Sequence, residues 1–379
     1  MKSKWETKTL GEVCKKGSSN VSLNKIQDNE GEYPIYGAKG FLKKVDFYHQ
    51  DKPYISIIKD GAGVGRVNLQ EAKSSVIGTL QYIIPKDDID INFLYYFLLG
   101  IDFEKYSCGA AIPHIYFKDY EKEEIKVPSL EEQEQIVKIL DEVFDSISKS
   151  KGNAEKNLKN AKELFESYLE EVFSNPRKDW EEKKLKEIVS KLGDGLHGTP
   201  KYDNQGEYYF INGNNLDNGK IIVKDITKKV SFEEYKKYKK ELNDRTVLVS
   251  INGTLGNVAF YNDEKIILGK SACYFNLLKN IDKDFIKYNI QSPTFFRYLQ
   301  KEYTGATIKN ISLKSMREYK VSFPKSLAEQ TAIVQKLDAL SSQVKQLEEI
   351  YKQKLKDLEE LKKSMLQKAF SGELTKNLN

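Results

Sequence analysis

The sequence predicts an α+β protein: two globular α/β domains separated by two long antiparallel helices in a coiled coil, built as a tandem repeat with pseudo-twofold symmetry. Three observations predict it. A sequence motif recurs about 200 residues later in the chain, each copy ends in a long amphipathic segment, and each interior alternates short β-like stretches with turns. We expect globular domains over residues 1–128 and 176–324, and helical regions over residues 129–175 and 325–379.

The repeat is clearest where the long helices begin. Leu130 to Asp141 matches Leu327 to Asp338 at an offset of 197 residues. The offset is smaller at the earlier landmarks, and it changes mainly within the first hundred residues of each half. Each half therefore has the same frame around a variable interior. The other matching landmarks are Gly109-Ala110 with Gly305-Ala306, Asp90 with Asp282, and Trp5 with Trp180.

Two long helices are predicted from apolar residues in alternating steps of three and four, which is the pattern of a coiled-coil seam. Pro128 and Pro324 stand just before them and prevent extension toward the N-terminus. The stretch from Val137 to Val172 would reach about 50 Å. The predicted seam residues are Val137, Leu140, Phe144, Ile147, Leu158, Phe165, Ile333, Leu337, Leu340, Val344, Leu347 and Leu358.

Such a seam could also pack on its own domain or form a dimerisation coil. A helix of about 50 Å is too long to bury itself on a domain of about 130 residues, whose radius of gyration is near 14 Å. We therefore expect the two helices to pack on each other and to carry one globular domain at each end.

The interiors predict strands, turns and short helices. Strand-like stretches include Tyr54 to Ile58, Leu80 to Ile84, Thr246 to Ile251 and Val258 to Tyr261. Gly-rich runs between strands, such as Gly61-Ala62-Gly63-Val64-Gly65, favour tight hairpins over a phosphate-binding loop, because no Lys-Ser/Thr follows. The Lys/Tyr-rich stretch from Ser231 to Leu242 predicts a solvated helix, with nucleic-acid contact as the alternative.

Composition restricts the class of protein. With 39% hydrophobic and 31% charged residues, the chain is neither collagen-like nor wholly disordered. The longest apolar run, Phe93 to Ile101, is about half the length of a membrane span, and no secretory signal follows Met1. Three scattered cysteines fit a reducing compartment. We expect a cytoplasmic protein that does not contact a membrane.

Catalytic motifs are not recognisable. The sequence shows no methyltransferase pocket motif, no Walker lysine, no nuclease carboxylate motif and no His/Cys cluster with metal-ligand spacing. His49, His114 and His197 each stand alone, so we interpret them as structural hydrogen-bonding residues. The net charge of +5 permits an anionic partner without requiring one. The pattern favours recognition without chemistry.

DNA is a ligand that fits the predicted geometry. Two similar domains at fixed separation suit half-sites about one helical turn, or about 34 Å, apart. Lysine, arginine, asparagine and tyrosine are frequent in the loops of both interiors, as contacts to phosphates and base edges require. Because the interiors differ in sequence, we expect the two half-sites to differ.

These features resemble the specificity (S) subunits of type I restriction–modification systems over nearly the whole chain. The resemblance is strongest in the duplicated openings of the long helices, led by Pro128 and Pro324, and in the endings Phe173-Ser174 and Phe370-Ser371. The segment Asp194 to Tyr202 is similar to one found near the start of target-recognition domains. The first half has instead Tyr33 to Gly40, which is similar to another version of this segment.

The resemblance implies two target-recognition domains that each read half of a bipartite asymmetric DNA site. It implies that the coiled coil sets the spacer length. It also implies docking of two modification (methyltransferase) subunits, which methylate adenine N6 with S-adenosylmethionine, and of two restriction subunits, which cut DNA with ATP and Mg²⁺. The chain itself would be non-catalytic and free of cofactor and metal.

Candidate DNA-binding residues follow from the same comparison and from the polar loops. The helix openings at Glu132, Gln133, Glu329 and Gln330 could serve in partner docking or in capping, and Lys309 and His114 lie close to the repeated Gly-Ala loops. The candidates for DNA contact are Tyr36, Lys39, Lys43, Lys44 and Arg66 in the first domain, and His197, Thr199, Lys201, Tyr202, Asn214 and Asn252 in the second.

Two alternatives remain open from the sequence. The chain could serve a type IIB-like enzyme, in which a separate specificity subunit pairs with a fused nuclease–methyltransferase. In a different class, it could be a coiled-coil scaffold whose two heads bind proteins, and such heads would show no salt-dependent affinity for duplex DNA.

Overall fold

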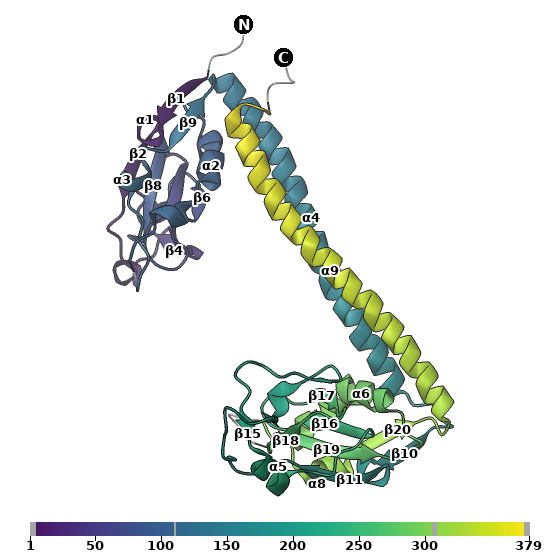
Figure 1. Ribbon diagram of the computed structural model, residues 1–379. Coiled ribbons are helices and arrows are strands. Elements are labelled where there is room, and N and C mark those ends of the chain that lie inside the picture. Colours follow the sequence, from purple (N-terminus) through teal and green to yellow (C-terminus); the bar gives the residue numbers. More distant parts are fainter. Residues whose placement is uncertain (1–4, 110, 305–308, 375–379) are drawn as a thin grey trace. The chain divides into compact units, whose positions relative to one another are not determined.

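The computed structural model describes residues 5–109, 111–304 and 309–374. The chain divides into two compact units: unit 1 holds Met1–Glu155 and Lys352–Asn379, and unit 2 holds Lys156–Tyr351. Two long helices, α4 (Leu130–Ser174) and α9 (Leu327–Ser371), contribute residues to both units (Figure 1). No helix in the described part of the chain is long and apolar enough to span a membrane.

The described residues of the globular part of unit 1 form three small sheets. A four-stranded antiparallel sheet has the order β2-β8-β5-β6, a three-stranded sheet has the order β4-β3-β7, and β1 pairs with β9. The strands are β1 (Glu6–Thr9), β2 (Cys14–Ser18), β3 (Tyr33–Gly37), β4 (Gly40–Val45), β5 (Tyr54–Ile58), β6 (Val67–Gln70), β7 (Ser75–Val76), β8 (Leu80–Pro85) and β9 (Glu124–Val127). The short helices are α1 (Leu10–Val13), η1 (Asn24–Ile26), α2 (Ile91–Gly100), η2 (Phe103–Tyr106) and α3 (Phe117–Tyr120).

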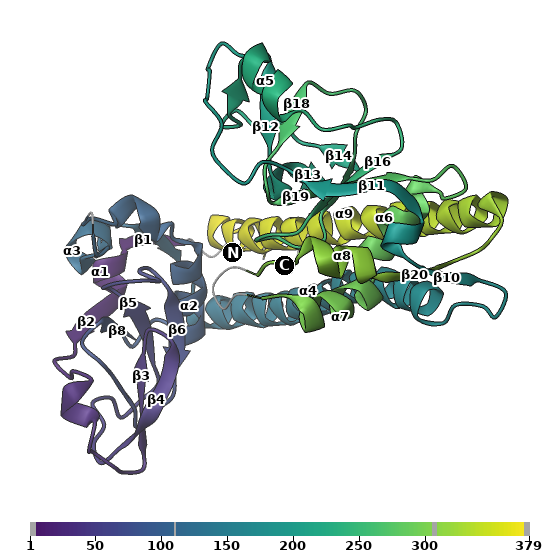
Figure 2. The same ribbon diagram turned by 90° about the horizontal axis from the view of Figure 1, so that it is seen from below.

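Unit 2 repeats this topology. Its sheets have the orders β11-β19-β16-β17 and β15-β12-β18, β10 pairs with β20, and β13-β14 is an added pair (Figure 2). The strands are β10 (Glu181–Lys184), β11 (Val189–Asp194), β12 (Tyr208–Ile211), β13 (Leu216–Asp217), β14 (Lys220–Ile221), β15 (Lys229–Val230), β16 (Thr246–Ser250), β17 (Val258–Phe260), β18 (Ile266–Leu268), β19 (Ala272–Leu277) and β20 (Lys320–Phe323). The short helices are η3 (Leu185–Glu187), η4 (Gly213–Asn215), α5 (Phe232–Tyr238), α6 (Lys283–Gln291), α7 (Pro293–Glu302) and α8 (Leu313–Glu318).

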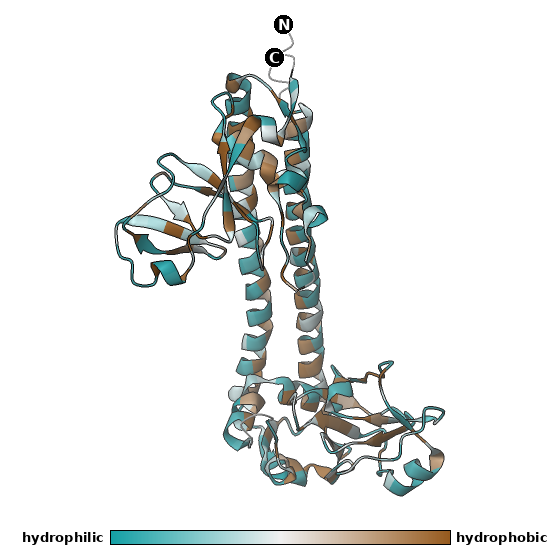
Figure 3. Cartoon of the chain, turned by 90° about the vertical axis from the view of Figure 1, so that its left-hand side faces the viewer, coloured by the Kyte–Doolittle hydropathy of each residue, from teal (hydrophilic) through white to brown (hydrophobic). Residues whose placement is uncertain are grey.

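The central strands are mainly apolar because both of their faces are covered, with Ser56, Thr246 and Ser250 as their buried polar residues. All five residues of β5 and all five of β16 are buried, and Figure 3 shows hydrophobic segments concentrated in the strands of each domain. Both strands start where the sequence predicts them. Each continues through a Gly-rich turn into an antiparallel partner, β6 or β17, so the predicted hairpins are confirmed.

The two long helices pack together antiparallel in both units. In unit 1, Lys151 of α4 pairs with Glu359 of α9 at 2.7 Å, and Lys362 lies over the Phe144 ring at 5.2 Å. In unit 2, Phe173 near the end of α4 shares a core with Leu337 near the start of α9. The expected antiparallel pair of long helices is therefore present.

Each long helix also anchors the domain beside it. In unit 1, Leu140 and Leu366 are buried in one core with Phe93 of α2. In unit 2, Leu337 is buried with Phe285 of α6. In each unit, residues of the long helices are thus buried against α2 or α6 as well as against the facing helix.

One predicted seam position on α9 is wrong. Leu347 is 38% exposed, whereas Val344 is 5% exposed. From Leu337 the buried and half-buried positions run through residues 340, 341, 344, 348, 351, 355 and 358. The seam consists of two lines of positions along α9, and one of these lines includes Ser341 and Glu348. Leu347, which precedes Glu348, therefore lies at the side of the seam. Residue type alone misassigned it, since leucine is the usual seam residue.

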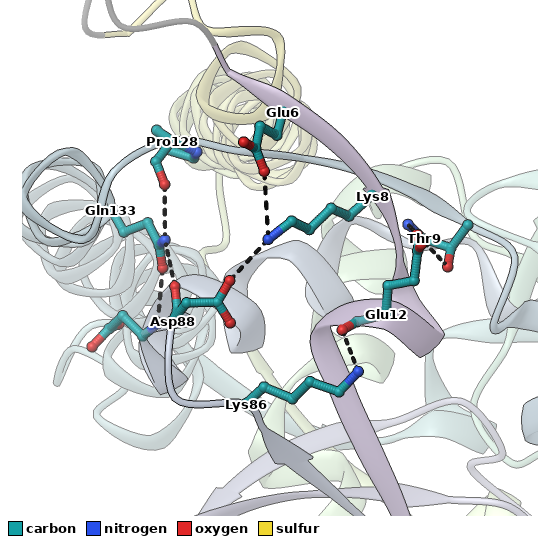
Figure 4. Close-up of polar contacts among 9 residues, drawn as sticks. Glu6, Lys8, Thr9, Glu12, Lys86, Asp88, Pro128 and Gln133 are labelled. Carbon is teal, nitrogen blue, oxygen red and sulfur yellow. Dashed lines mark hydrogen bonds and ion pairs between the residues drawn. The ribbon is translucent and has the colours of Figure 1, made fainter.

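A glutamine clamps the start of each long helix. The fully buried Gln133 side chain accepts a hydrogen bond from the Asp90 amide at 2.8 Å and donates to the carbonyls of Asp88 and Pro128 at 3.1 and 3.0 Å (Figure 4). Asp90 in turn caps α2 by accepting from the amides of Asn92 and Phe93. The clamp joins two helix starts in one polar network.

Unit 2 repeats this clamp with Gln330. Its side chain accepts from the Asp282 amide at 2.8 Å and donates to the carbonyls of Asn280 and Pro324 at 3.1 and 2.8 Å. Asp282 caps α6. The buried glutamines therefore have a structural role: they bond backbone groups just before α2 or α6 and just before the long helices, whereas Asp90 and Asp282 provide the helix caps.

The glutamates that precede the clamps bind different partners. Glu132 accepts a hydrogen bond from the Trp5 indole at 3.1 Å. Glu329 accepts one from Arg177 at 3.3 Å. Each glutamate ties the segment before its domain's first strand to the start of a long helix.

Candidate nucleic-acid interface

A pair of loops projects from the end of the central strand in unit 1. The turn after β5 is bonded to the segment before α3: the Gly61 amide donates to the Pro113 carbonyl and the Ile115 amide to the Lys59 carbonyl, both at 2.9 Å. Gly61, with φ +86°, requires the left-handed backbone region. Between these bonds the His114 ring nitrogen Nδ1 lies 2.8 Å from Oδ1 of Asp60, with both side chains about one-third exposed.

Unit 2 contains the same pair of loops after β16. The Gly253 amide donates to the Lys309 carbonyl at 3.0 Å, and the Ile311 amide donates to the Ile251 carbonyl at 2.8 Å. Between them Asn252 donates from Nδ2 to Oδ1 of Asn310 at 3.2 Å. The backbone frame is thus repeated, while a histidine–aspartate pair in one unit is replaced by an asparagine pair in the other.

Predicted residues of unit 1 meet at a hairpin tip. Ala38 and Lys39 form the two-residue turn between β3 and β4, and Arg66 donates to the Ala38 carbonyl at 3.3 Å. Tyr36 is half-buried beside the Gly37–Gly40 pair that closes this turn. Burial and a hydrogen bond to Glu71 raise the pKa of Tyr36 to about 12. Phe41, which the sequence did not single out, is 58% exposed beside it. Lys39, Arg66 and Phe41 thus present cations and an aromatic face together.

The other two lysines predicted in unit 1 lie along β4. Lys43 is half-buried, and its ammonium donates to the Gln27 carbonyl at 3.0 Å. Lys44 is exposed on the next residue, and successive side chains of a strand point to opposite faces. These two lysines therefore do not belong to a single surface.

The loop predicted in unit 2 is exposed around its histidine. The His197 ring lies 2.6 Å from Oδ2 of Asp194, and Thr199 and Lys201 are exposed. Tyr202 is 45% exposed and packs on Phe210 with ring centroids 6.1 Å apart.

Asn214 and Asn252 lie on two segments of unit 2 that pack against each other near Ser250. Asn214 is exposed in η4, and its carbonyl accepts a hydrogen bond from Lys224 at 3.2 Å. The neighbouring Gly213 packs against Ser250 at the end of β16, two residues before Asn252. The η4 turn therefore packs beside the strand that leads into the loop pair.

Helix α5 of unit 2 is a further candidate for nucleic-acid contact, which the sequence analysis gave only as an alternative. In α5 no residue is buried, as expected of a solvated helix, and it ends at Tyr238, before the predicted Leu242. Tyr235 stacks on Tyr208 with centroids 4.1 Å apart, and Lys236 lies over the Phe232 ring at 4.8 Å. Aromatic rings interleaved with lysines suit a nucleic-acid backbone. The Lys/Tyr-rich composition of the stretch from Ser231 to Leu242 was the feature of the sequence that pointed to this surface.

Each of the three histidines has one side-chain hydrogen-bonding partner. His49 bonds to the Tyr82 hydroxyl at 3.2 Å, and His114 and His197 each face one aspartate. Within the described ranges, no three His, Cys, Asp or Glu side chains gather as metal ligands would. Cys14 and Cys273 are buried, and burial raises the pKa of both thiols.

Comparison with known proteins gives a consistent result. Residues 2–159 and 177–359 match the family model of the type I restriction modification DNA specificity domain. The chain is 26% identical to the type I restriction enzyme MjaVIII specificity subunit of Methanocaldococcus jannaschii, over 99% of this chain and 94% of that protein. It is 22% identical to the EcoDI specificity subunit of Escherichia coli, over 98% and 89%.

Solved structures agree in fold. A chain from a structural study of complex assembly and conformational transition of the type I restriction–modification system aligns with a TM-score of 0.74 at 17% identity, covering 97% of this chain and 98% of that one. The HsdS subunit of Thermoanaerobacter tengcongensis aligns with a TM-score of 0.59 at 16% identity, covering 98% and 97%. The likeness extends over nearly the full length of both chains.

Proposed function

The chain belongs to the specificity (S) subunits of type I restriction–modification systems, and from this premise we propose that it reads a bipartite, asymmetric DNA site with one half-site per globular domain. S subunits are non-catalytic. The proposal assigns target recognition to residues 1–128 and 176–324, and the helical regions to residues 129–175 and 325–379.

The observation that carries the proposal is the repeated loop pair with unlike side chains. Asp60 with His114 and Asn252 with Asn310 occupy the same position on the same backbone frame. Carboxylate, imidazole and amide groups present different donors and acceptors to a base edge. A frame repeated twice with different polar groups is what reading two different half-sites requires.

The proposed DNA contacts fall into two classes, contacts to phosphates and contacts to base edges. Lysine and arginine would bind phosphates and fix the register, which makes affinity fall with salt without specifying sequence. Histidine, asparagine, threonine and tyrosine would approach base edges. The residues so proposed are Tyr36, Lys39, Lys43, Lys44 and Arg66 for one half-site, and His197, Thr199, Lys201, Tyr202, Asn214 and Asn252 for the other.

The proposed partners supply the chemistry. Two modification subunits would bind S-adenosylmethionine and methylate adenine N6, and restriction subunits would add ATP- and Mg²⁺-dependent cleavage. The contribution of this chain is to bind, orient and space them on DNA.

Lengthening the helix pair tests the bipartite reading. Seven residues inserted into α4 after Glu155 and seven into α9 after Leu355 keep the seam in register, because a heptad is its repeat. Each helix gains about 10.5 Å, which corresponds to about three base pairs of spacer. We expect the methylated motif to keep both half-sites and to gain about three base pairs between them. A change in half-site sequence would refute the proposal.

A further inference from the structure

The connection after the central strand of the three-stranded sheet differs between the two units. In unit 1, β3 pairs antiparallel with β4 and parallel with β7. In unit 2, β12 pairs antiparallel with β15 and parallel with β18. The turn Ala38-Lys39 connects β3 to β4, whereas residues 212–228 connect β12 to β15. The short turn and the long segment therefore occupy corresponding places in the fold.

The short connection of unit 1 carries an exposed aromatic ring beside two cations. Phe41 is 58% exposed at the start of β4, and its ring meets Tyr36 edge-on with centroids 6.2 Å apart. Lys39 and Arg66 are exposed, and Arg66 donates to the Ala38 carbonyl at 3.3 Å. This tip of unit 1 thus offers an apolar face next to positive charge.

The long connection of unit 2 carries exposed aliphatic residues among lysines. Ile226 is 81% exposed, Val223 is 45% exposed and Ile222 is 37% exposed. Residues 217–229 contain four lysines and two aspartates, so the segment has a net positive charge. The fully exposed lysines of this segment are Lys220, Lys224 and Lys228.

A buried asparagine holds the aliphatic tip of unit 2 in place. Asn215 is 5% exposed and donates from Nδ2 to the Ile222 carbonyl at 2.9 Å and to the Thr227 hydroxyl at 3.3 Å. The Thr227 amide donates to the Lys224 carbonyl at 2.8 Å, and the Thr227 hydroxyl accepts from the Lys224 amide at 2.8 Å. Ile226 therefore lies in a turn that is fixed before any ligand binds, which reduces the entropy lost on binding.

Both tips lie beside residues proposed above for DNA. In unit 2 the Lys224 ammonium donates to the Asn214 carbonyl at 3.2 Å, and in unit 1 the tip includes Lys39 and Arg66. A single exposed apolar residue needs no explanation. Exposed apolar residues that recur next to cations, at corresponding connections of unlike sequence, indicate a ligand with both anionic and apolar groups.

We propose that each tip enters the major groove of DNA and packs against the methyl group of a thymine, through Phe41 in one half-site and Ile226 in the other. The proposal rests on the proposed function and adds these two residues to those that read bases. The C5-methyl of thymine is the apolar group that base pairs present in the major groove. Isoleucine and phenylalanine side chains have no hydrogen-bond donor or acceptor, so they recognise thymine by this contact, while the neighbouring cations bind phosphates.

Serine substitutions remove the apolar contact without changing charge. The complex of this chain with its methyltransferase subunit is assayed on duplex DNA that carries the motif methylated by the unchanged complex. Ile226→Ser should lower the methylation rate about tenfold and relax one T·A pair in the half-site of the second domain only. Phe41→Ser should do the same in the half-site of the first domain. Ile226→Val should retain the preference, and Leu278→Ser, at a leucine 39% exposed just after β19, should change neither half-site.

Deoxyuridine in place of the thymine gives a second readout, because it lacks the methyl group and keeps the base pairing. The unchanged complex should lose about tenfold in rate on this DNA, and Ile226→Ser should lose nothing further, since the contact is already absent. Unaltered motifs and rates in both serine variants, or additive losses, would overturn the inference and leave the proposed function intact. Release of the methyltransferase subunit by Ile226→Ser would also overturn it, by indicating a protein ligand at the tip. Absence of bipartite methylation by the unchanged complex would contradict both.

Discussion

Replacing Gln133 with alanine removes the clamp between α4 and α2 in unit 1. The side chain is fully buried and makes three hydrogen bonds, one as acceptor from the Asp90 amide and two as donor to carbonyls. Alanine leaves all three backbone groups without this partner in the core, and Gln330→Ala does the same in unit 2.

The expected loss follows from the bond count. Each intramolecular hydrogen bond contributes about 0.5–1.5 kcal/mol net, and buried groups left unpaired cost at least as much. Gln133→Ala should therefore lower the free energy of unfolding of unit 1 by about 2–4 kcal/mol. Gln330→Ala should lower that of unit 2 by a similar amount, because Gln330 makes three corresponding bonds to backbone groups, at 2.8, 3.1 and 2.8 Å.

Hydrogen exchange of single amides gives the most direct measurement. In Gln133→Ala the Asp90 amide should lose protection while the Asp282 amide keeps it, and Gln330→Ala should give the reverse. Gln135→Ala provides a control on the exposed face of the same helix turn and should change unfolding by less than about 0.5 kcal/mol. Equal stability and equal Asp90 protection in Gln133→Ala and Gln135→Ala would refute the clamp.

Two further outcomes concern the seam and an ion pair. Leu337→Asp should lower the free energy of unfolding of unit 2 by about 4 kcal/mol in urea, since it buries an unpaired charge. Leu347→Asp should change this free energy by less than about 0.5 kcal/mol. Equal effects of the two variants would contradict the corrected seam. Hydrogen bonds from Lys184 and Lys186 lower the pKa of Glu318 from 4.5 to about 2. The stabilisation is therefore complete above pH 4.5 and is lost as pH falls toward about 2, so Glu318→Gln should flatten stability over this range; an unchanged pH profile would show that the pairs contribute nothing.

The parts of the fold predicted from sequence are those set by local pattern. The helices begin after Pro128 and Pro324, because proline cannot continue a helix backwards. The strand Tyr54–Ile58 was predicted with the bounds that it has in the structure, because a run of buried β-branched and aromatic residues is typical of a central strand. Leu347 shows where this reasoning fails. Either Leu347 or Glu348 could occupy the seam by sequence spacing, and the packing of the facing helix determines which of them does.

The candidate site depends on contacts that no local pattern specifies. Asp60 and His114 are 54 residues apart, and they meet because the turn after β5 is bonded to the segment before α3. The link from Arg66 to the Ala38 carbonyl similarly joins two hairpins. Composition indicated that such loops carry polar and basic residues, but their grouping arises from the tertiary fold.

Mapping of DNA methylation by single-molecule sequencing tests the central claim most directly. A host that expresses this chain with its methyltransferase subunit should carry N6-methyladenine on both strands of one bipartite motif with two different half-sites. Arg66→Ala should weaken methylation at this motif without altering it, as expected of a phosphate contact. Methylation confined to a short continuous motif would contradict the reading of one half-site by each domain.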